Sequence, residues 1–290
     1  MRIRRFALLP AFAAWSCSSC SSGPADPPPP PSAVLVAAGD IADCRSTGDE
    51  ATAALLDGID GTVAVLGDNA YENGSEQEYR DCYHPTWGRH KARTRPTPGN
   101  HEYQTPGAAG YFAYFGAAAG NPAEGWYSYD LGAWHVVSLN SELPVAAGSA
   151  QEQWLRADLA AHPARCTLAY WHRPRFSSSL HGNNAAMQPL WQALYDAGAD
   201  VVLVGHDHAY ERFAPQTPTG AADPARGIRQ FLVGTGGRAL YQFNAPVANS
   251  EVRYNQTFGV IKLTLEADAY TWEFIPVSGT FRDTGRTTCH

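Results

Sequence analysis

The chain has 290 residues, of which 44% are hydrophobic and 17% charged, so it carries enough apolar side chains to close a sizeable core. This composition excludes an intrinsically disordered chain and a collagen-like repeat. The formal net charge of −7 becomes −10 once Arg2, Arg4 and Arg5 are removed with an N-terminal tip, so we expect no nucleic-acid-binding surface. An anionic substrate stays compatible with this charge, because bound metal ions reverse the local field.

The N-terminal 22 residues are typical of a secretory signal. Residues 1–5 are basic, residues 6–15 are mostly apolar and residues 16–23 are small, and the apolar run is too short to span a bilayer. We therefore predict a signal peptide or lipoprotein signal over 1–22 and a protein outside the cytoplasm. Cys17 and Cys20 resemble the lipid-modified cysteine of bacterial lipoproteins, although the usual aliphatic residue three places before Cys17 is missing. Secretion, a periplasmic location and a lipid anchor in the membrane all stay open.

A proline-rich linker is predicted over residues 23–32. The uninterrupted run from Pro27 to Pro31 favours an extended polyproline II conformation, which would act as a semi-rigid spacer. The folded domain is therefore expected over residues 33–290.

Apolar runs that end in glycine mark the buried strands of this domain. The runs at 33–38 (AVLVAA), 62–66 (TVAVL) and 200–204 (DVVLV) have the nearly continuous apolar character of strands in a helix-covered parallel sheet. Apolar side chains at helical spacing between and around these runs predict helices. The predicted helices cover residues 50–56, 150–160 and 185–197.

Further strands follow one another without a helix between them. They are predicted over residues 126–131, 134–139, 167–171, 229–233, 259–266 and 269–276. Strand pairs without an intervening helix indicate mixed sheets rather than a simple doubly wound fold. We therefore expect an α/β fold of two packed mixed β-sheets flanked by helices, a four-layer αββα sandwich.

Four cysteines lie within the predicted domain, at positions 44, 82, 166 and 289. An even number in an exported chain favours disulfides over free thiols or a zinc site. Of the three pairings we expect Cys44 with Cys82, because both follow loops at the same sheet edge, and Cys166 with Cys289, which would pin the C-terminus. Four unpaired cysteines in the core are the alternative.

Polar side chains gather directly after the predicted strands, where α/β proteins bind ligands. Carboxylate, carboxamide, imidazole and phenol groups are the donors present, and they suit hard or borderline metal ions. A lone Gly-Asp is usually a turn and a lone buried histidine usually a core residue, but several such motifs at strand ends together predict a metal site. The motifs are Gly39-Asp40, Gly67-Asp68-Asn69-Ala70-Tyr71, Gly99-Asn100-His101-Glu102, Trp171-His172 and Gly205-His206-Asp207-His208.

This ordered set resembles the calcineurin-like metallophosphoesterases, and within them the purple acid phosphatases and their bacterial relatives. The family pattern is Gly-Asp, Gly-Asp-x-x-Tyr, Gly-Asn-His-Asp/Glu, Val-x-x-His and Gly-His-x-His, and the resemblance covers roughly residues 35–280. Ala169 departs from it at a packing position, and Ala42 stands where phosphodiesterase branches have a metal-binding histidine. Branches that lack that histidine take a tyrosine ligand instead, and Tyr71 lies three residues after Asp68 as their pattern requires.

The resemblance implies a site for two metal ions that share one bridging carboxylate. Sharing holds the ions about 3.5 to 4 Å apart, so that both can contact one phosphate. A phenolate favours a trivalent ion, so we expect iron(III) at the tyrosine site and zinc, manganese or iron(II) at the other. For Tyr71 the alternative is an aromatic side chain that merely flanks the site. The implied ligands are Asp40, Asp68, Tyr71 and His208 for one ion, and Asp68, Asn100, His172 and His206 for the other.

The resemblance also implies catalytic roles for His101 and His181. His101 follows a predicted ligand directly and would protonate the leaving alkoxide or bind a phosphate oxygen, although it could merely orient a ligand. His181 lies nine residues after His172 in a Ser/Gly/Asn-rich loop, a spacing like that of substrate-contacting histidines in purple acid phosphatases; an idle surface histidine is the alternative. Asp207 is expected to support the ligands, and the glycine-rich segment 234–237 to form a tight turn beside the site.

We therefore predict an exported enzyme that hydrolyses small-molecule phosphate monoesters by attack of a metal-activated hydroxide, without a covalent intermediate. A phosphodiesterase or nucleotidase on the same metals is one alternative, and a catalytically silent metal-binding or interaction domain is another. The presence of all seven implied ligands together with His101 argues against the silent domain. The sequence identifies no protein partner.

Overall fold

The computed structural model describes Met1 and residues 32–290. The predicted signal segment beyond Met1 and the predicted linker before Ser32 lie outside the described residues. Within the part of the chain that is described, no helix has the length and apolar character needed to cross a membrane.

Six strands form the first sheet, in the order β13-β12-β11-β1-β2-β3. β1, β2 and β3 run parallel, whereas β11 is antiparallel to β1 and begins an antiparallel run through β12 to β13. The sheet is therefore mixed, as predicted. Its strands are β1 (Ala33–Ala38), β2 (Thr62–Leu66), β3 (Thr94–Thr97), β11 (Gly259–Leu265), β12 (Ala269–Pro276) and β13 (Thr284–Thr288).

Seven strands form the second sheet, in the order β10-β8-β9-β7-β6-β5-β4. The four central strands β5, β6, β7 and β9 are parallel, and β4, β8 and β10 add antiparallel pairs at the two sides. The strands are β4 (Tyr127–Leu131), β5 (Trp134–Ser138), β6 (Cys166–Trp171), β7 (Val201–Val204), β8 (Tyr210–Phe213), β9 (Arg229–Val233) and β10 (Ser250–Tyr254).

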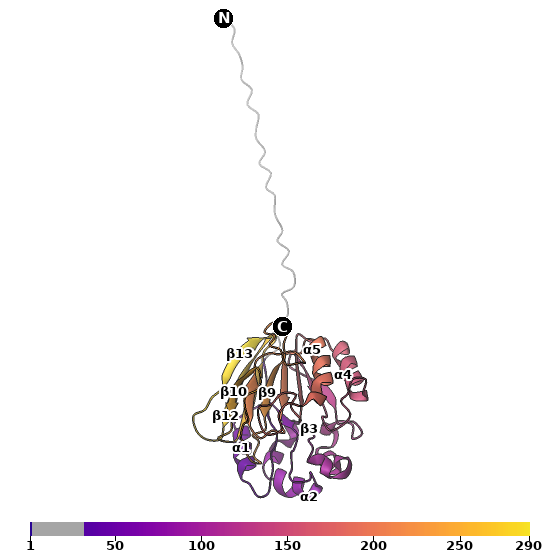
Figure 1. Ribbon diagram of the computed structural model, residues 1–290, viewed down its shortest axis with the longest axis vertical. Coiled ribbons are helices and arrows are strands. Elements are labelled where there is room, and N and C mark those ends of the chain that lie inside the picture. The colour runs from indigo at the N-terminus through magenta and orange to yellow at the C-terminus, as the bar shows by residue number, and fades with distance from the viewer. Residues whose placement is uncertain (2–31) are drawn as a thin grey trace.

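Helices lie outside the two sheets, with α4 and α5 side by side on one flank and α1 and α2 in the other half of the molecule (Figure 1). The Ser149 side chain starts α4 by accepting a hydrogen bond from the backbone N–H of Glu152, which satisfies one of the free donors of the first turn. The helices are α1 (Gly48–Asp57), α2 (Glu76–Glu78), α3 (Ala109–Phe115), α4 (Ala150–Ala161) and α5 (Gln188–Asp196), with short tighter or wider helical turns at 79–83, 87–93, 102–104, 106–108, 116–119 and 185–187.

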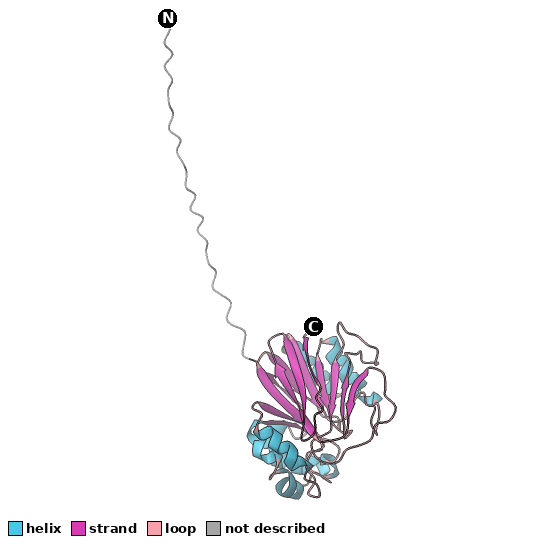
Figure 2. Cartoon of the chain, turned by 90° about the vertical axis from the view of Figure 1, so that its left-hand side faces the viewer, coloured by secondary structure: helices cyan, strands magenta, loops and turns pink. Residues whose placement is uncertain are grey.

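Side chains alternate along the central strands between two apolar cores. On β7, Val201 and Leu203 point into the core between the two sheets, whereas Val202 and Val204 pack in the second core, with Leu155 of α4 and with α5. Because successive strand residues point to opposite faces, a strand with an apolar core on each face is apolar throughout. This arrangement confirms the predicted fold of two packed mixed sheets flanked by helices (Figure 2).

The nine predicted strands and the first two predicted helices are present with ends shifted by at most two residues. The third helix begins at Gln188 after a separate turn over 185–187, because Pro189 occupies its first turn. Four strands were not predicted. β3 contains Pro96, β8 is too short and polar to stand out, and β10 and β13 are sheet edges with alternately exposed residues.

Both predicted disulfides are present. Cys44 pairs with Cys82 and Cys166 with Cys289, with Cα–Cα distances of 4.9 and 5.5 Å. The alternative of four unpaired cysteines is therefore wrong.

Candidate metal centre

The carboxyl ends of β1 and β2 in one sheet and of β6 and β7 in the other meet at one edge of the sandwich. Glycines allow this approach: a Cβ on Gly205 would lie 2.8 Å from Oδ2 of Asp40, and a Cβ on Gly67 would lie 2.6 Å from Nδ1 of His172. Only a residue without a side chain fits at such contacts. The glycines before Asp40, Asp68 and His206 therefore let loops of both sheets pack against one another with their polar side chains facing inward.

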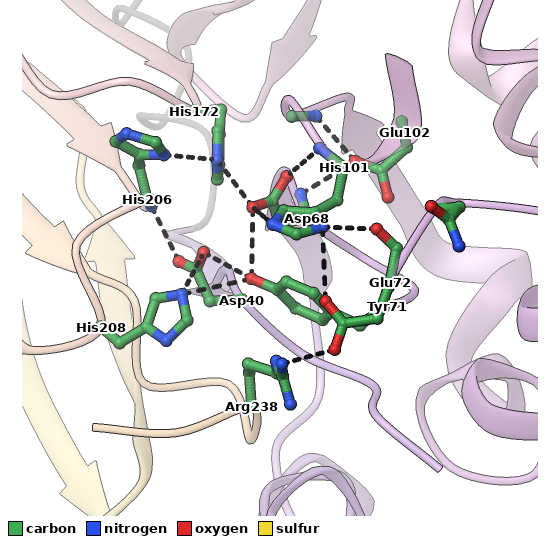
Figure 3. Close-up of polar contacts among 12 residues, drawn as sticks. Asp40, Asp68, Tyr71, Glu72, His101, Glu102, His172, His206, His208 and Arg238 are labelled. Carbon is green, nitrogen blue, oxygen red and sulfur yellow. Dashed lines mark hydrogen bonds and ion pairs between the residues drawn. The ribbon is translucent and has the colours of Figure 1, made fainter. Parts of the chain in front are cut away.

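Three other predicted ligands converge on the phenol of Tyr71 (Figure 3). Its Oη lies 3.0 Å from Oδ1 of Asp40, 3.2 Å from Oδ2 of Asp68 and 3.3 Å from Nε2 of His208. Ala42, the residue that departs from the phosphodiesterase pattern, is fully buried and its carbonyl accepts a hydrogen bond from the backbone N–H of Tyr71. The side chains of Asp40, Asp68, Tyr71 and His208 form the first half of the centre.

The second half is built from Asp68, His172 and His206, whose ligand atoms lie within 4.8 Å of one another. Nε2 of His172 is 3.2 Å from Oδ2 of Asp68 and 3.2 Å from Nδ1 of His206. His172 donates its Nδ1–H to the carbonyl oxygen of Leu66 at 2.8 Å, which fixes the ring and turns Nε2 toward the centre. A carbonyl partner of this kind is common behind metal-binding histidines.

Two predicted ligands leave buried polar atoms without a partner among the described residues. They are Oδ1 of Asn100 and Nδ1 of His208. No hydrogen bond joins Asn100 to the other predicted ligands in the described chain, but the backbone N–H of the next residue, His101, donates to Oδ1 of Asp68 at 2.9 Å. Because buried oxygen atoms are rarely left unpaired, the free Asn100 carboxamide oxygen fits a site that takes a cation.

The charges at the centre also fit cations. Burial and the neighbouring carboxylates of Asp40 and Asp68 raise the pKa of the Tyr71 phenol well above its ordinary value, so a phenolate there requires a positive charge beside it. Burial alone would lower the pKa of His172, but the Asp68 charge outweighs it and raises that pKa to about 10. Burial and the positive charges of His172 and Arg173 lower the pKa of His206 to about 2, so His206 is neutral and offers a lone pair.

His101 lies beside the centre, with its ring centroid 4.5 Å from that of Tyr71. Its Nδ1–H donates to the carbonyl oxygen of Glu72 at 2.5 Å, and Nε2 is 3.8 Å from Oδ2 of Asp68. The ring is partly exposed and so can reach a ligand from solvent.

His181 is brought to the opposite side, where its ring stacks on that of His206 with centroids 4.3 Å apart. Nδ1 of His181 lies 2.8 Å from Oδ1 of the buried Asp207, and the backbone N–H of His181 donates to the same oxygen at 3.0 Å. Asp207 thus fixes the His181 loop. The segment 234–237 packs against the Asp40 loop, where the backbone N–H of Gly236 donates to the Gly39 carbonyl at 2.8 Å.

Glu102 is an unpredicted part of the centre, although it ends one of the five motifs. Its fully buried carboxylate accepts hydrogen bonds from the backbone N–H groups of Gly99 at 2.7 Å, Asp68 at 2.9 Å and Asn69 at 2.8 Å. Burial and the nearby Asp68 charge raise the pKa of Glu102 to about 7. The side chain therefore ties the loop that carries Asp68 to the loop that carries Asn100.

Three further side chains around the centre were missed. Nη1 of Arg173 lies 3.2 Å from Nε2 of His206, and the guanidinium also pairs with Glu142 at 2.9 Å. The Arg238 guanidinium lies over the Tyr71 ring at 5.0 Å, and Tyr241 stacks on His208 with ring centroids 4.0 Å apart. Arg173 could have been noticed because it directly follows a predicted ligand, and Arg238 because it directly follows the glycine-rich segment 234–237. Tyr241 lies further along an irregular loop with no distinguishing pattern.

Comparisons with known proteins find relatives among the acid phosphatases. The chain is 33% identical over 183 residues to purple acid phosphatase 21 of Arabidopsis thaliana, covering 55% of this chain and 41% of the relative. It is 32% identical over 145 residues to human acid phosphatase type 7, covering 41% of this chain and 32% of the relative. The chain thus spans less than half the length of these curated relatives.

Solved structures share the fold. The purple acid phosphatase PPD1 from yellow lupin seeds matches with a TM-score of 0.72 at 21% identity, over 89% of this chain and 54% of that one. GAP50, described as the anchor in the inner membrane complex of Plasmodium, matches with a TM-score of 0.71 at 12% identity, over 89% of each chain. At these identities the likeness concerns the fold alone.

A family model described as calcineurin-like phosphoesterase matches residues 25–210, which include all the predicted ligands and both predicted catalytic histidines. The chain belongs to the calcineurin-like phosphoesterase family.

Proposed function

We propose that this chain is a phosphatase that hydrolyses small-molecule phosphate monoesters at a centre of two metal ions. The observation that carries the proposal is the convergence of Asp40, Asp68 and His208 on the Tyr71 phenol, directly beside the group formed by Asp68, His172 and His206. Asp68 belongs to both groups and would be shared by the two ions. The resemblance to purple acid phosphatases and the free Oδ1 of Asn100 support the remaining ligand.

A pair of metal ions, when bound, activates water as the nucleophile and neutralises charge on the phosphate. The chain's own side chains hold those ions and the substrate in place. Asp40, Tyr71 and His208 would hold one ion, and Asn100, His172 and His206 the other, with Asp68 between them. The Leu66 carbonyl, which accepts from Nδ1 of His172, keeps that ring in the orientation for binding.

His101 and His181 flank the centre and would act on the substrate itself. The Glu72 carbonyl oxygen accepts a hydrogen bond from the Nδ1–H of His101. The proton that this ring can deliver to the leaving alkoxide is therefore the one on Nε2. His181 likewise has Nδ1 engaged by Asp207, which leaves Nε2 to contact a phosphate oxygen. We assign proton delivery to His101 and phosphate binding to His181.

The deciding experiment measures turnover of an aryl phosphate and of a bis-aryl phosphate diester on the same preparation, with its metal content determined. Faster turnover of the monoester with about two ions per chain supports the proposal. Faster turnover of the diester would favour the phosphodiesterase alternative, and metal binding without turnover of either would leave only a silent binding domain.

The metal at the tyrosine position is proposed to be iron(III), with zinc, manganese or iron(II) at the other position. A phenolate bonded to iron(III) absorbs visible light, so the iron-loaded protein should be pink or violet. Tyr71→Phe should lose this colour while it keeps its fold. An unchanged spectrum in Tyr71→Phe would remove Tyr71 from the ligands. A colourless, active zinc form would refute the iron assignment but not the ligand set.

The location outside the cytoplasm also stays a proposal. Two disulfides fit an oxidising compartment, because cytosolic proteins keep thiols reduced. Mass spectrometry of the mature chain would decide between cleavage after about 22 residues and lipid attachment at Cys17 or Cys20.

A further inference from the structure

A second group of metal-ligating side chains lies far from the centre, between the second sheet and α4. We call it the distal His-Asp cluster and define it by His135 of β5 and by Asp158 and His162 at the end of α4. His135 pairs with Thr167 near the start of β6, whereas His172 follows the last residue of that strand. Five residues of extended chain separate those two positions on β6, or about 17 Å.

The three side chains are already in mutual contact. Nε2 of His135 lies 2.8 Å from Oδ2 of Asp158, and Nδ1 of His162 lies 3.2 Å from Oδ1 of the same carboxylate. The two imidazole rings are stacked with centroids 4.9 Å apart and planes inclined by 13°. Asp130 faces the other nitrogen of His135, with Oδ1 at 3.2 Å from Nδ1. Ligand atoms of His135, Asp158 and His162 all fall within 4.8 Å of one another.

The charges around the cluster favour a cation. The carboxylates of Asp130 and Asp158 lie on either side of the His135 ring and place negative charge at the cluster. The C-terminal end of a helix also attracts positive charge, and His162 follows the last residue of α4.

The cluster is also accessible. His135 and Asp158 are buried, but the His162 side chain is 50% exposed and borders two surface hollows of about 360 and 370 Å³. Arg165 lines one of these hollows but forms no hydrogen bond or ion pair with the cluster among the described contacts. An ion can therefore reach the ligands from solvent past His162.

We propose that the distal His-Asp cluster binds one divalent transition-metal ion of the zinc class, with His135, Asp158 and His162 as protein ligands. Two imidazoles and one carboxylate form a common zinc donor set, and water would complete a tetrahedron. The ion would take the place of the hydrogen bond between Nε2 of His135 and Oδ2 of Asp158. It would tie β5 to the end of α4, so its function would be structural rather than catalytic.

The test compares the zinc content of the full chain with that of His162→Gln after dialysis against zinc and removal of unbound metal. The wild type should hold one more zinc ion per chain than His162→Gln. The control His84→Gln removes another exposed histidine, which contacts Tyr114, and should match the wild type. Zinc should also raise the melting temperature of the wild type by more than that of His162→Gln.

Equal zinc content in the wild type, His162→Gln and His84→Gln would overturn the proposal and leave a purely hydrogen-bonded network. Because His162 is half exposed, its replacement should leave the fold and the phosphatase turnover intact. Asp158→Asn gives a second variant that should lose the same ion. Failure of the proposed phosphatase function would abolish turnover in all variants without changing the difference in zinc content, so the two outcomes are distinguishable.

Discussion

The two ends of the β-sandwich differ in backbone conformation and in the hydrogen bonds that their polar groups form. At the end that carries the metal centre, Asp40, Asp68 and His206 have φ angles of 61°, 51° and 73°, in the left-handed region that non-glycine residues avoid. At the opposite end, where β6 and β7 begin, the Asp200 carboxylate accepts hydrogen bonds from the backbone N–H groups of Thr167 at 2.9 Å and His290 at 3.1 Å. The Cys166–Cys289 disulfide closes the same end.

This difference shows that the centre is held in place at a cost in stability. A left-handed conformation costs a residue roughly 1 to 2 kcal/mol, and three predicted ligands adopt it. Strain of this kind persists only where the surrounding structure holds it. The paired and cross-linked end supplies part of that stability, so substitutions at the two ends should affect different properties, activity at one and unfolding at the other.

The largest effect is expected from Asp68→Ala, which removes a donor common to both halves of the centre. Turnover should be abolished and metal content should fall by at least one ion per chain, because each ion loses a ligand. Metal analysis and an aryl phosphate assay on the folded variant check this. Retained turnover with full metal content would refute the two-ion centre.

His101→Ala should lower kcat by about 10² to 10⁴-fold, the usual contribution of a positioned general acid or base. Metal content should stay the same, since His101 contacts the centre mainly through its backbone N–H and through its ring beside Tyr71. A loss of metal would instead make His101 a ligand. His84→Gln is the matched control for a histidine replaced outside the centre.

Glu102→Gln tests whether the strained end depends on one buried carboxylate. Glutamine keeps one acceptor oxygen but turns an NH₂ group toward backbone N–H donors of Gly99, Asp68 or Asn69. An unpaired buried donor costs about 1 to 3 kcal/mol, so urea unfolding should show a loss of that size together with weaker metal binding. Unchanged stability and metal content would show that the two loops hold their positions without Glu102.

The contrast between the two ends was only partly predictable from the sequence. Most of the predicted ligands could be found because they follow a glycine or the end of an apolar strand directly or within four residues, and that pattern is local. The contacts of Glu102 could not be predicted, because its carboxylate accepts from the backbone N–H of Asp68, 34 residues away in the sequence. Tyr241 stacks on His208 through the path of an irregular loop, and β13 is a polar strand at the edge of its sheet. Hydrophobic periodicity gives no signal for any of these.

The two disulfides, one near each end, allow a direct comparison of the ends. The expected difference in the free energy of unfolding between them is the smallest of the effects predicted here. The Cys166–Cys289 bond closes a segment of 123 residues and the Cys44–Cys82 bond one of 38. In the chain-entropy model these loops correspond to about 5 and about 4 kcal/mol of stabilisation, so replacing the first pair by serine should cost about 1 kcal/mol more in urea unfolding.

The two disulfide variants should differ more clearly in activity than in stability. Cys44 lies one residue past Asp43, which pairs with the Arg238 guanidinium over the Tyr71 ring, so loss of the Cys44–Cys82 bond loosens the loop that carries Asp40. The Cys44→Ser/Cys82→Ser variant should therefore lose kcat/KM and metal affinity, whereas Cys166→Ser/Cys289→Ser should unfold more easily but keep its kcat/KM at temperatures where it stays folded. Native wild-type protein should show no reactive thiol at these four positions until it is reduced. If both variants lost kcat/KM equally while folded, the division of the sandwich into a strained catalytic end and a stabilising end would be wrong, because strain at the centre would then depend on the whole domain.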